Sequence, residues 1–372
     1  MIIQNAKVLN CEILRFEQRE LYIENGIITD RLPEDRQVLD AGGAFVIPGF
    51  IDTHIHGYYN CDFGTPGTDL TPARLALARQ GTTGFAATVS TRPLAKLEGD
   101  LRWLRQQMDV PSPGAKLLGL HAEGPFISEK RKGAMIPTGE EASARAVEKL
   151  LEAAGGALKL MTLAPERENA VEIIEILKDR LHFSLGHTDA TYAQAMAAID
   201  AGASRATHTF NGMRPLSHRE TGILGAVLTD DRIHCEMIAD FVHLDPAAVK
   251  LVYKAKGFEN ITLISDTGYM GGLPDGEYNG RIVRDGVART LAGVICGSCF
   301  TMLRGARNLR KLGIPLAEVS VMASWNPAKA LGLEDTLGRI APGYCADLIL
   351  CDEDLNIHTV LMDGKPAQEA AV

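Results

Sequence analysis

A chain of 372 residues, 46% of them hydrophobic, is long enough to form one large barrel domain or two smaller domains. Its formal net charge of −9 argues against nucleic-acid and membrane-surface binders, which usually carry a basic patch. The N-terminus has no signal-peptide pattern, and no apolar run is long enough to span a bilayer. The seven cysteines lack a disulfide-framework spacing, so we expect reduced thiols, a cytoplasmic protein, and neither nucleic acid nor membrane as partner.

Both ends of the chain are predicted to be rich in β-structure. Residues 1–46 alternate short apolar runs with turns, and IENG at 23–26 predicts a hairpin turn. Residues 334–372 show the same alternation. We therefore predict a small β-sandwich domain built from residues 1–46 and 334–372, beside a central domain of residues 47–333.

Eight short apolar runs follow one another through the central region, each suited to a buried parallel strand. They cover residues 46–56, 83–90, 115–123, 157–166, 181–187, 204–210, 232–240 and 260–266. Helical patterns separate most of them, as at 71–81, 93–108, 169–180 and 245–256. This repeated alternation predicts an α/β fold, a (β/α)8 TIM-like barrel with right-handed crossovers.

Polar side chains stand at the C-terminal ends of five of these runs, the rim at which barrel enzymes build their active sites. A histidine in such a place is, taken alone, more often a hydrogen-bonded rim residue than a ligand. Six groups at strand ends favour one shared site instead, and imidazoles with carboxylates suit a zinc-like divalent ion. The six are His54 and His56, which lie on one side of their strand, Glu123, His187, His208 and Asp266.

The motifs around these positions also resemble a known family. PGFIDTHIHG, LHAEGPF, LGHTDAT, THTFNGMRPLSHRETG and ISDT occur in this order. Together they resemble the amidohydrolase superfamily and, within it, the N-acetylglucosamine-6-phosphate deacetylase family. The similarity extends over essentially the whole chain, through GLPDGEY at 272–278 to the tail that ends in APGYCADLIL.

The resemblance implies a metal-dependent hydrolase of linear amides in amino-sugar catabolism, which releases acetate from N-acetylglucosamine 6-phosphate. Zinc is the first choice of metal, with iron, manganese or cobalt as alternatives, and one or two ions per subunit are expected. The implied roles are metal ligation by Glu123, His187 and His208, a second metal held by His54 and His56, and acid–base catalysis by Asp266.

The resemblance further implies a phosphate site completed across the boundary of a homodimer. Its residues are Asn211, Gly212, Arg219 and His243. One position departs from the family pattern: the segment RKGAMIP carries Met135 where a carbonyl-polarising histidine is usual. A thioether cannot donate a hydrogen bond, so either a second metal, Tyr58 or Tyr269 takes that role, or the substrate differs.

Three alternatives remain. The substrate could be the galactosamine epimer or another N-acyl amino sugar, because hydroxyl stereochemistry is read by hydrogen bonds that the sequence does not locate. A cyclic-amide hydrolase is disfavoured, because such enzymes usually bridge two metals with a carboxylated lysine, whereas Lys159 lies within its strand. A non-catalytic scaffold is disfavoured because no ligand or acid has been lost.

Overall fold

The computed structural model describes residues 1–367, and its central feature is a sheet of eight parallel strands. The strands neighbour one another in chain order, and the last meets the first where Asp266 N donates to His54 O over 2.9 Å. They are β6 (Phe50–Ile55), β9 (Thr82–Ser90), β10 (Lys116–Glu123), β11 (Leu158–Leu163), β12 (His182–Leu185), β13 (Arg205–Ala206), β14 (His234–Ile238) and β15 (Ile261–Ile264).

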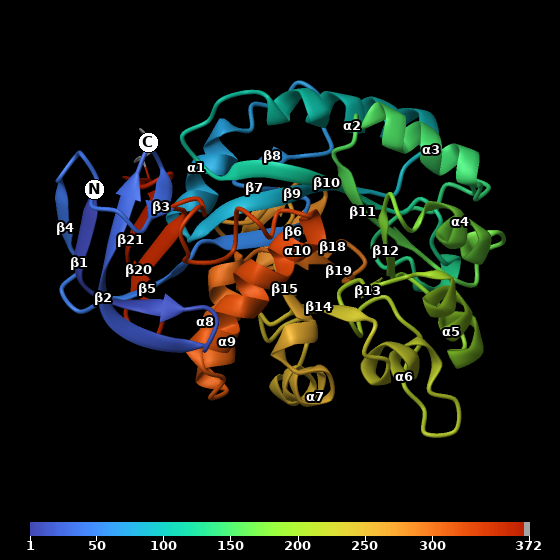
Figure 1. The fold of residues 1–372 in the computed structure, drawn as a ribbon. Coiled ribbons are helices and arrows are strands. Elements are labelled where there is room, and N and C mark those ends of the chain that lie inside the picture. The colour runs from blue at the N-terminus through green and yellow to red at the C-terminus, as the bar shows by residue number, and fades with distance from the viewer. Residues whose placement is uncertain (368–372) are drawn as a thin grey trace.

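A helix follows each of the eight strands and covers the outside of the barrel (Figure 1). They are α1 (Thr71–Arg79), α2 (Leu94–Met108), α3 (Ala144–Ala153), α4 (Ala170–Leu177), α5 (Tyr192–Ala201), α6 (Gly222–Thr229), α7 (Pro246–Lys256) and α8 (Met302–Lys311). Capping residues set the first residue of some of these helices. Thr191 and Gln194 form a capping box on α5, and Asp245 caps α7 ahead of Pro246. The predicted (β/α)8 barrel is confirmed.

Two of the predicted strands differ from those observed. The first run is divided at Gly49: β5 (Phe45–Pro48) pairs with terminal strands, and only β6 enters the barrel. The sixth run shrinks to the two residues of β13, because the chain turns into left-handed conformations at His208 and Phe210, with φ of 28° and 80°.

The two ends of the chain share a second sheet of eight strands beside the barrel, where the N-terminal strands and the C-terminal strands lie together in Figure 1. Its strands are β1 (Ile2–Asn10), β2 (Arg15–Glu24), β3 (Ile27–Thr29), β4 (Val38–Asp40), β5, β20 (Leu348–Cys351), β21 (Ile357–Met362) and β22 (Lys365–Pro366). The predicted hairpin turn joins β2 to β3, with Asn25 and Gly26 both at positive φ. The domain boundaries at 46/47 and 333/334 stay a prediction.

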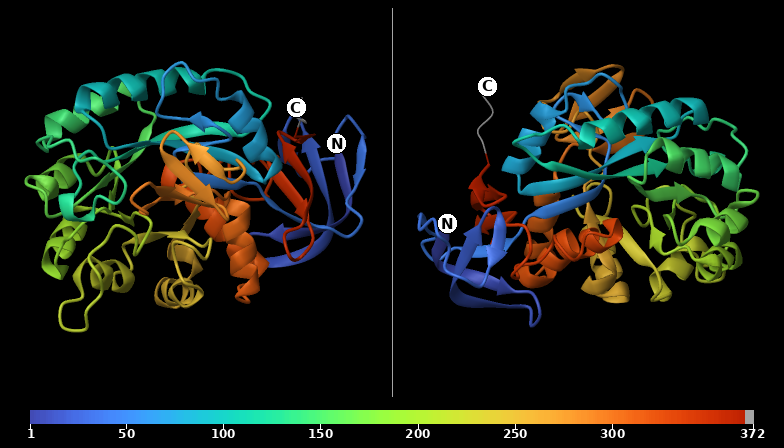
Figure 2. Two further views of the ribbon diagram at one scale, coloured as in Figure 1. Left: turned by 180° about the vertical axis from the view of Figure 1, so that it is seen from behind. Right: turned by 45° about the horizontal axis from the view of Figure 1, so that its top comes forward.

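A four-stranded antiparallel sheet interrupts the connection between β15 and α8 and lies over the barrel in the left view of Figure 2. It consists of β16 (Gly276–Tyr278), β17 (Arg281–Arg284), β18 (Val287–Thr290) and β19 (Ile295–Ser298). The remaining elements are the hairpin β7 (Gly57–Tyr58) and β8 (Cys61–Asp62), the short turns Glu129–Arg131 and Phe258–Asn260, and the helical run α9 (Leu316–Ser320), Val321–Trp325 and α10 (Asn326–Leu331). Within residues 1–367 no helix is long and apolar enough to cross a membrane.

Candidate metal centre and active site

The six predicted site residues gather at the C-terminal rim of the barrel, each at or within two residues of the end of a strand. His54 lies in β6, His56 follows its last residue, and Glu123 ends β10. Three others follow their strands in left-handed backbone conformations: His187 has φ 45°, His208 has φ 28° and Asp266 has φ 50°. Non-glycine residues in this region cost conformational energy and cluster at functional sites. The three left-handed residues are therefore typical of a functional site, where the surrounding structure holds the backbone in place.

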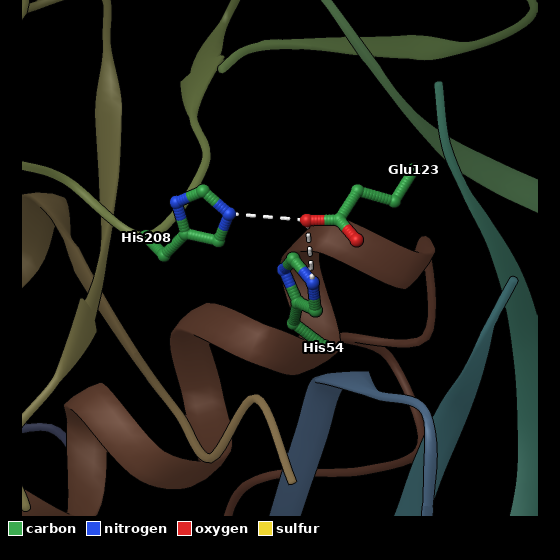
Figure 3. Close-up of side chains that lie close together, drawn as sticks. All are labelled: His54, Glu123 and His208. Atoms are coloured by element: carbon green, nitrogen blue, oxygen red, sulfur yellow. Dashed lines mark hydrogen bonds and ion pairs between the residues drawn. The ribbon is translucent and has the colours of Figure 1, made fainter. Parts of the chain in front are cut away.

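One carboxylate oxygen of Glu123 is the meeting point of three imidazoles, two of which are drawn in Figure 3. Glu123 Oε1 lies 3.0 Å from His208 Nε2 and 3.3 Å from His54 Nε2. The third distance, to His187 Nε2, is 3.2 Å, and the two Nε2 atoms of His187 and His208 are 3.0 Å apart. All of these side chains are almost completely buried.

The remaining two residues extend the cluster from the other oxygen of Glu123. His56 Nε2 lies 3.2 Å from Glu123 Oε2 and 3.3 Å from Asp266 Oδ1. Asp266 Oδ1 is also 3.6 Å from His54 Nε2. The structure therefore brings together all six residues that the sequence assigned to the metal and the acid.

The four histidines are oriented by their other ring nitrogens, which all have oxygen partners outside the cluster. The partners of Nδ1 are Glu236 Oε2 for His54 at 3.0 Å, Ser90 Oγ for His56 at 3.0 Å, Arg131 O for His187 at 2.8 Å and Asn211 O for His208 at 3.1 Å. A histidine that donates through Nδ1 presents the lone pair of Nε2, and this is the usual arrangement of metal-bound histidines.

The donor set fits a divalent cation. When Nδ1 carries the proton, the Nε2 atoms of His187 and His208 present lone pairs to each other and to the Glu123 carboxylate. These groups repel one another unless a cation lies between them. Tetrahedral zinc with bonds of about 2.0 to 2.1 Å places its ligand atoms about 3.3 Å apart, close to the separations found here. Within residues 1–367, three sets of ligand atoms lie within 4.8 Å of one another: His54 with Glu123 and His208, His54 with His56 and Asp266, and His54 with His121 and Glu236.

The electrostatics of the cluster also favour a cation. Burial alone would raise the pKa of Glu123, but the charge of His54 and hydrogen bonds from His187 and His208 outweigh it and hold that pKa well below its usual range. Burial likewise opposes ionisation of Asp266, yet the hydrogen bond from His56 and the imidazole charges lower its pKa to about 2. Both carboxylates are therefore anionic at neutral pH.

Five of the six cluster residues, all but the fully buried His54, line a cavity of about 600 Å³. Three of the four residues predicted to bind phosphate, Asn211, Gly212 and His243, line this cavity. Burial would lower the pKa of His243, but its ring is 2.8 Å from Asp240 Oδ2, and the pair raises that pKa. Arg219 is exposed on the loop after β13 and does not line the cavity of its own chain.

Two cationic residues in the cavity wall were not predicted. Arg281 of β17 and Arg289 of β18 line the cavity, and within residues 1–367 neither forms an ion pair with a carboxylate. Arg289 donates to Gly293 O over 3.2 Å, while Arg281 lies 5.7 Å from the ring centre of Tyr269. By contrast, Arg92, also in the wall, is bound to Asp100 over 2.6 Å. The arginines of the short sheet are therefore free to meet an anion.

Met135, which stands where the family usually has a carbonyl-polarising histidine, also belongs to this cavity. Met135 lines it, as does Tyr269, whose hydroxyl donates to Tyr278 O over 3.0 Å. Tyr58 is buried against Gly271 and Gly272 and does not line the cavity.

Comparison with known proteins agrees with this geometry. Residues 45–367 match the model of the amidohydrolase family. The N-acetylglucosamine-6-phosphate deacetylase of Lysinibacillus sphaericus is 34% identical over 98% of this chain and 97% of its own length. An N-acetylgalactosamine-6-phosphate deacetylase of Escherichia coli is 35% identical over 94% and 95% of the two chains.

A solved structure superposes closely over the whole molecule. It is a point mutant of the N-acetyl-D-glucosamine-6-phosphate deacetylase of Mycobacterium smegmatis in complex with N-acetyl-D-glucosamine-6-phosphate, with a TM-score of 0.90, 33% identity and 99% of each chain covered. The barrel, the rim cluster and these near-full-length similarities show that the chain belongs to the amidohydrolase family and, within it, to the N-acetylglucosamine-6-phosphate deacetylases.

Proposed function

We propose that this protein hydrolyses the acetamide of N-acetylglucosamine 6-phosphate, yielding glucosamine 6-phosphate and acetate. The observation that carries the proposal is the cluster of four imidazoles and two carboxylates at a cavity with cationic walls. The near-full-length relatives of that name support the amino-sugar substrate.

In this proposal Glu123, His187 and His208 would hold a divalent ion, and His54 and His56 would be available to hold a second one. When bound, a divalent ion lowers the pKa of its bound water and can polarise an amide carbonyl. Hydrolysis of an acetamide at neutral pH needs this help, because the amide is a poor electrophile. Zinc suits the imidazole and carboxylate donors, and iron, manganese and cobalt are the alternatives that metal analysis would distinguish.

Asp266 is the proposed general base and acid. Its carboxylate is ionised at neutral pH and lines the cavity beside His56, so it can accept the proton of the attacking water. It then delivers that proton to the amine nitrogen as the carbon–nitrogen bond breaks, because an amide anion is too basic to leave unprotonated. Met135 has no proton to donate, so a cation held by the cluster would supply the polarisation of the carbonyl.

The sugar phosphate is proposed to bind beside His243, Asn211 and Gly212. His243 carries positive charge when protonated, and its raised pKa favours that state. Arg281 and Arg289 add two guanidinium groups from the short sheet, and a guanidinium binds phosphate through charge-assisted hydrogen bonds.

Arg219 is proposed to complete the pocket of a second copy, in a homodimer. It is exposed and outside its own cavity, which agrees with a role across an interface. Mixing Asp266→Asn with Arg219→Ala, assayed at a low substrate concentration at which both variants are strongly impaired, tests this directly: random exchange gives hybrids with one intact site, and about a quarter of the wild-type activity should return. A mixture that stays inactive, or a monomer in sedimentation, would refute it.

The substrate is tested by acetate release from purified, zinc-loaded protein. N-acetylglucosamine 6-phosphate should give the highest kcat/KM, and removal of the phosphate should lower it by roughly 10- to 150-fold, the value of one charged hydrogen bond. Faster hydrolysis of the galactosamine epimer would reassign the sugar, and equal rates without phosphate would refute the anion pocket. The seven free cysteines support the cytoplasm as the compartment of this activity.

A further inference from the structure

Glu236 is a buried carboxylate directly beneath the rim cluster. It lies in the middle of β14, within the barrel, and its side chain is fully inaccessible to solvent. Charged side chains are rarely buried to this extent unless they are paired, so the contacts of this carboxylate identify its role.

One oxygen of Glu236 holds two of the cluster histidines at once. His54 Nδ1 donates to Glu236 Oε2 over 3.0 Å, and the backbone N–H of His208 donates to the same oxygen over 3.3 Å. The other oxygen, Oε1, forms no hydrogen bond with the protein in residues 1–367. The carboxylate is therefore directed at the two histidines, although this leaves one buried acceptor unpaired.

Each of the two contacts fixes a different property. The bond to His54 selects the tautomer with the proton on Nδ1 and points Nε2 at Glu123 Oε1, 3.3 Å away. The bond to His208 engages the backbone of a residue with φ 28°, a conformation that an L-amino acid rarely adopts. The backbone of Glu236 supports the same turn, because Thr209 N donates to Glu236 O over 2.9 Å.

We propose that Glu236 is the positioning residue of the metal centre, which sets the ring of His54 and the strained turn of His208 through a single carboxylate oxygen. The inference rests on the metal site proposed above and goes beyond it, because Glu236 does not itself touch the substrate cavity. Carboxylates that orient ligand histidines commonly change metal affinity by about 10- to 100-fold when they are removed.

The test is zinc affinity, measured on metal-free protein by competition with a chromophoric chelator, with the cobalt(II) absorption spectrum as a reporter of coordination. Glu236→Leu removes the acceptor, and Glu236→Gln keeps an oxygen in its place. Met237→Leu is the matched control: it is the next residue of β14 and equally buried, and Met-to-Leu changes are well tolerated in cores. Thermal unfolding of each metal-free variant records whether the barrel itself has changed.

The Leu variant should bind zinc about 10- to 100-fold more weakly and give an altered cobalt spectrum. The Gln variant should recover most of the affinity, and Met237→Leu should match the wild type. Wild-type affinity in Glu236→Leu would overturn the inference, as would an equal loss in Glu236→Gln or in Met237→Leu. A wild-type protein that binds no zinc would refute the metal site as well. One that binds zinc but releases no acetate would refute only the proposed substrate.

Discussion

Binding of a second zinc ion, held by His54 and His56, should depend steeply on pH, because His56 carries a proton that the metal must displace. Burial alone would lower the pKa of His56, but hydrogen bonds to Asp266 and Glu123 outweigh it and raise that pKa to about 9 in the metal-free protein. Below that pH the Nε2 of His56 is protonated, and only the neutral ring can bind a cation.

The size of the effect follows from the distance between this pKa and the working pH. From pH 9 to pH 7, each unit costs 1.36 kcal/mol, so releasing one proton weakens zinc binding by about 2.7 kcal/mol, or about 100-fold. The sign is fixed: affinity rises as pH rises and levels off above about 9. His54, whose pKa is also raised, would steepen the dependence in the same direction.

Calorimetric titration of metal-free protein with zinc, in buffers of different ionisation enthalpy, counts the protons released. Chelator competition at pH 7, 8 and 9 measures the slope. His56→Asn is the matched variant, and its slope should be shallower by about one proton per zinc bound. Equal affinity at pH 7 and pH 9, or no proton release at pH 7, would show that the ring of His56 does not take part in binding.

Two further predictions concern turnover. Asp266→Asn should lower kcat by about 100- to 10,000-fold, the usual contribution of a general acid–base, while zinc content measured by mass spectrometry stays at the wild-type level; normal turnover would refute its role. Arg289→Gln should raise KM for the phosphorylated sugar by about 2- to 10-fold, since this side chain is exposed, and leave the unphosphorylated sugar unaffected. Arg284→Gln, which is also exposed in the same sheet but lies outside the cavity, is its control. If both arginine variants behave alike, Arg289 does not contact phosphate.

The barrel and its rim could be predicted because their signals are local. Strands buried on both faces give continuous apolar runs, and a polar residue at the end of such a run is conspicuous, as with Glu123 and Asp266. Parallel strands of a barrel end at one rim, so residues far apart in the sequence were expected to meet there, and the distances around Glu123 confirm that they do.

The features that escaped prediction depend on backbone geometry or on long-range contacts. The short strands of residues 276–298 are polar and partly exposed, so they lack the apolar pattern of a strand, and Arg281 and Arg289 gave no signal of facing the cavity. β13 is short because the backbone turns into a left-handed conformation at His208. The residue types at this position do not predict that turn. Glu236 did leave a trace: it is a charged residue within the apolar run 232–240, and a charge in a buried strand indicates a paired or functional group.

The most direct test of the account is anomalous diffraction at the zinc edge from crystals of the zinc-loaded protein. We predict a peak at the barrel rim about 2.0 to 2.2 Å from a carboxylate oxygen of Glu123 and from the Nε2 atoms of His187 and His208. A rim without a peak, in which these imidazoles donate hydrogen bonds to Glu123 directly, would contradict the metal centre.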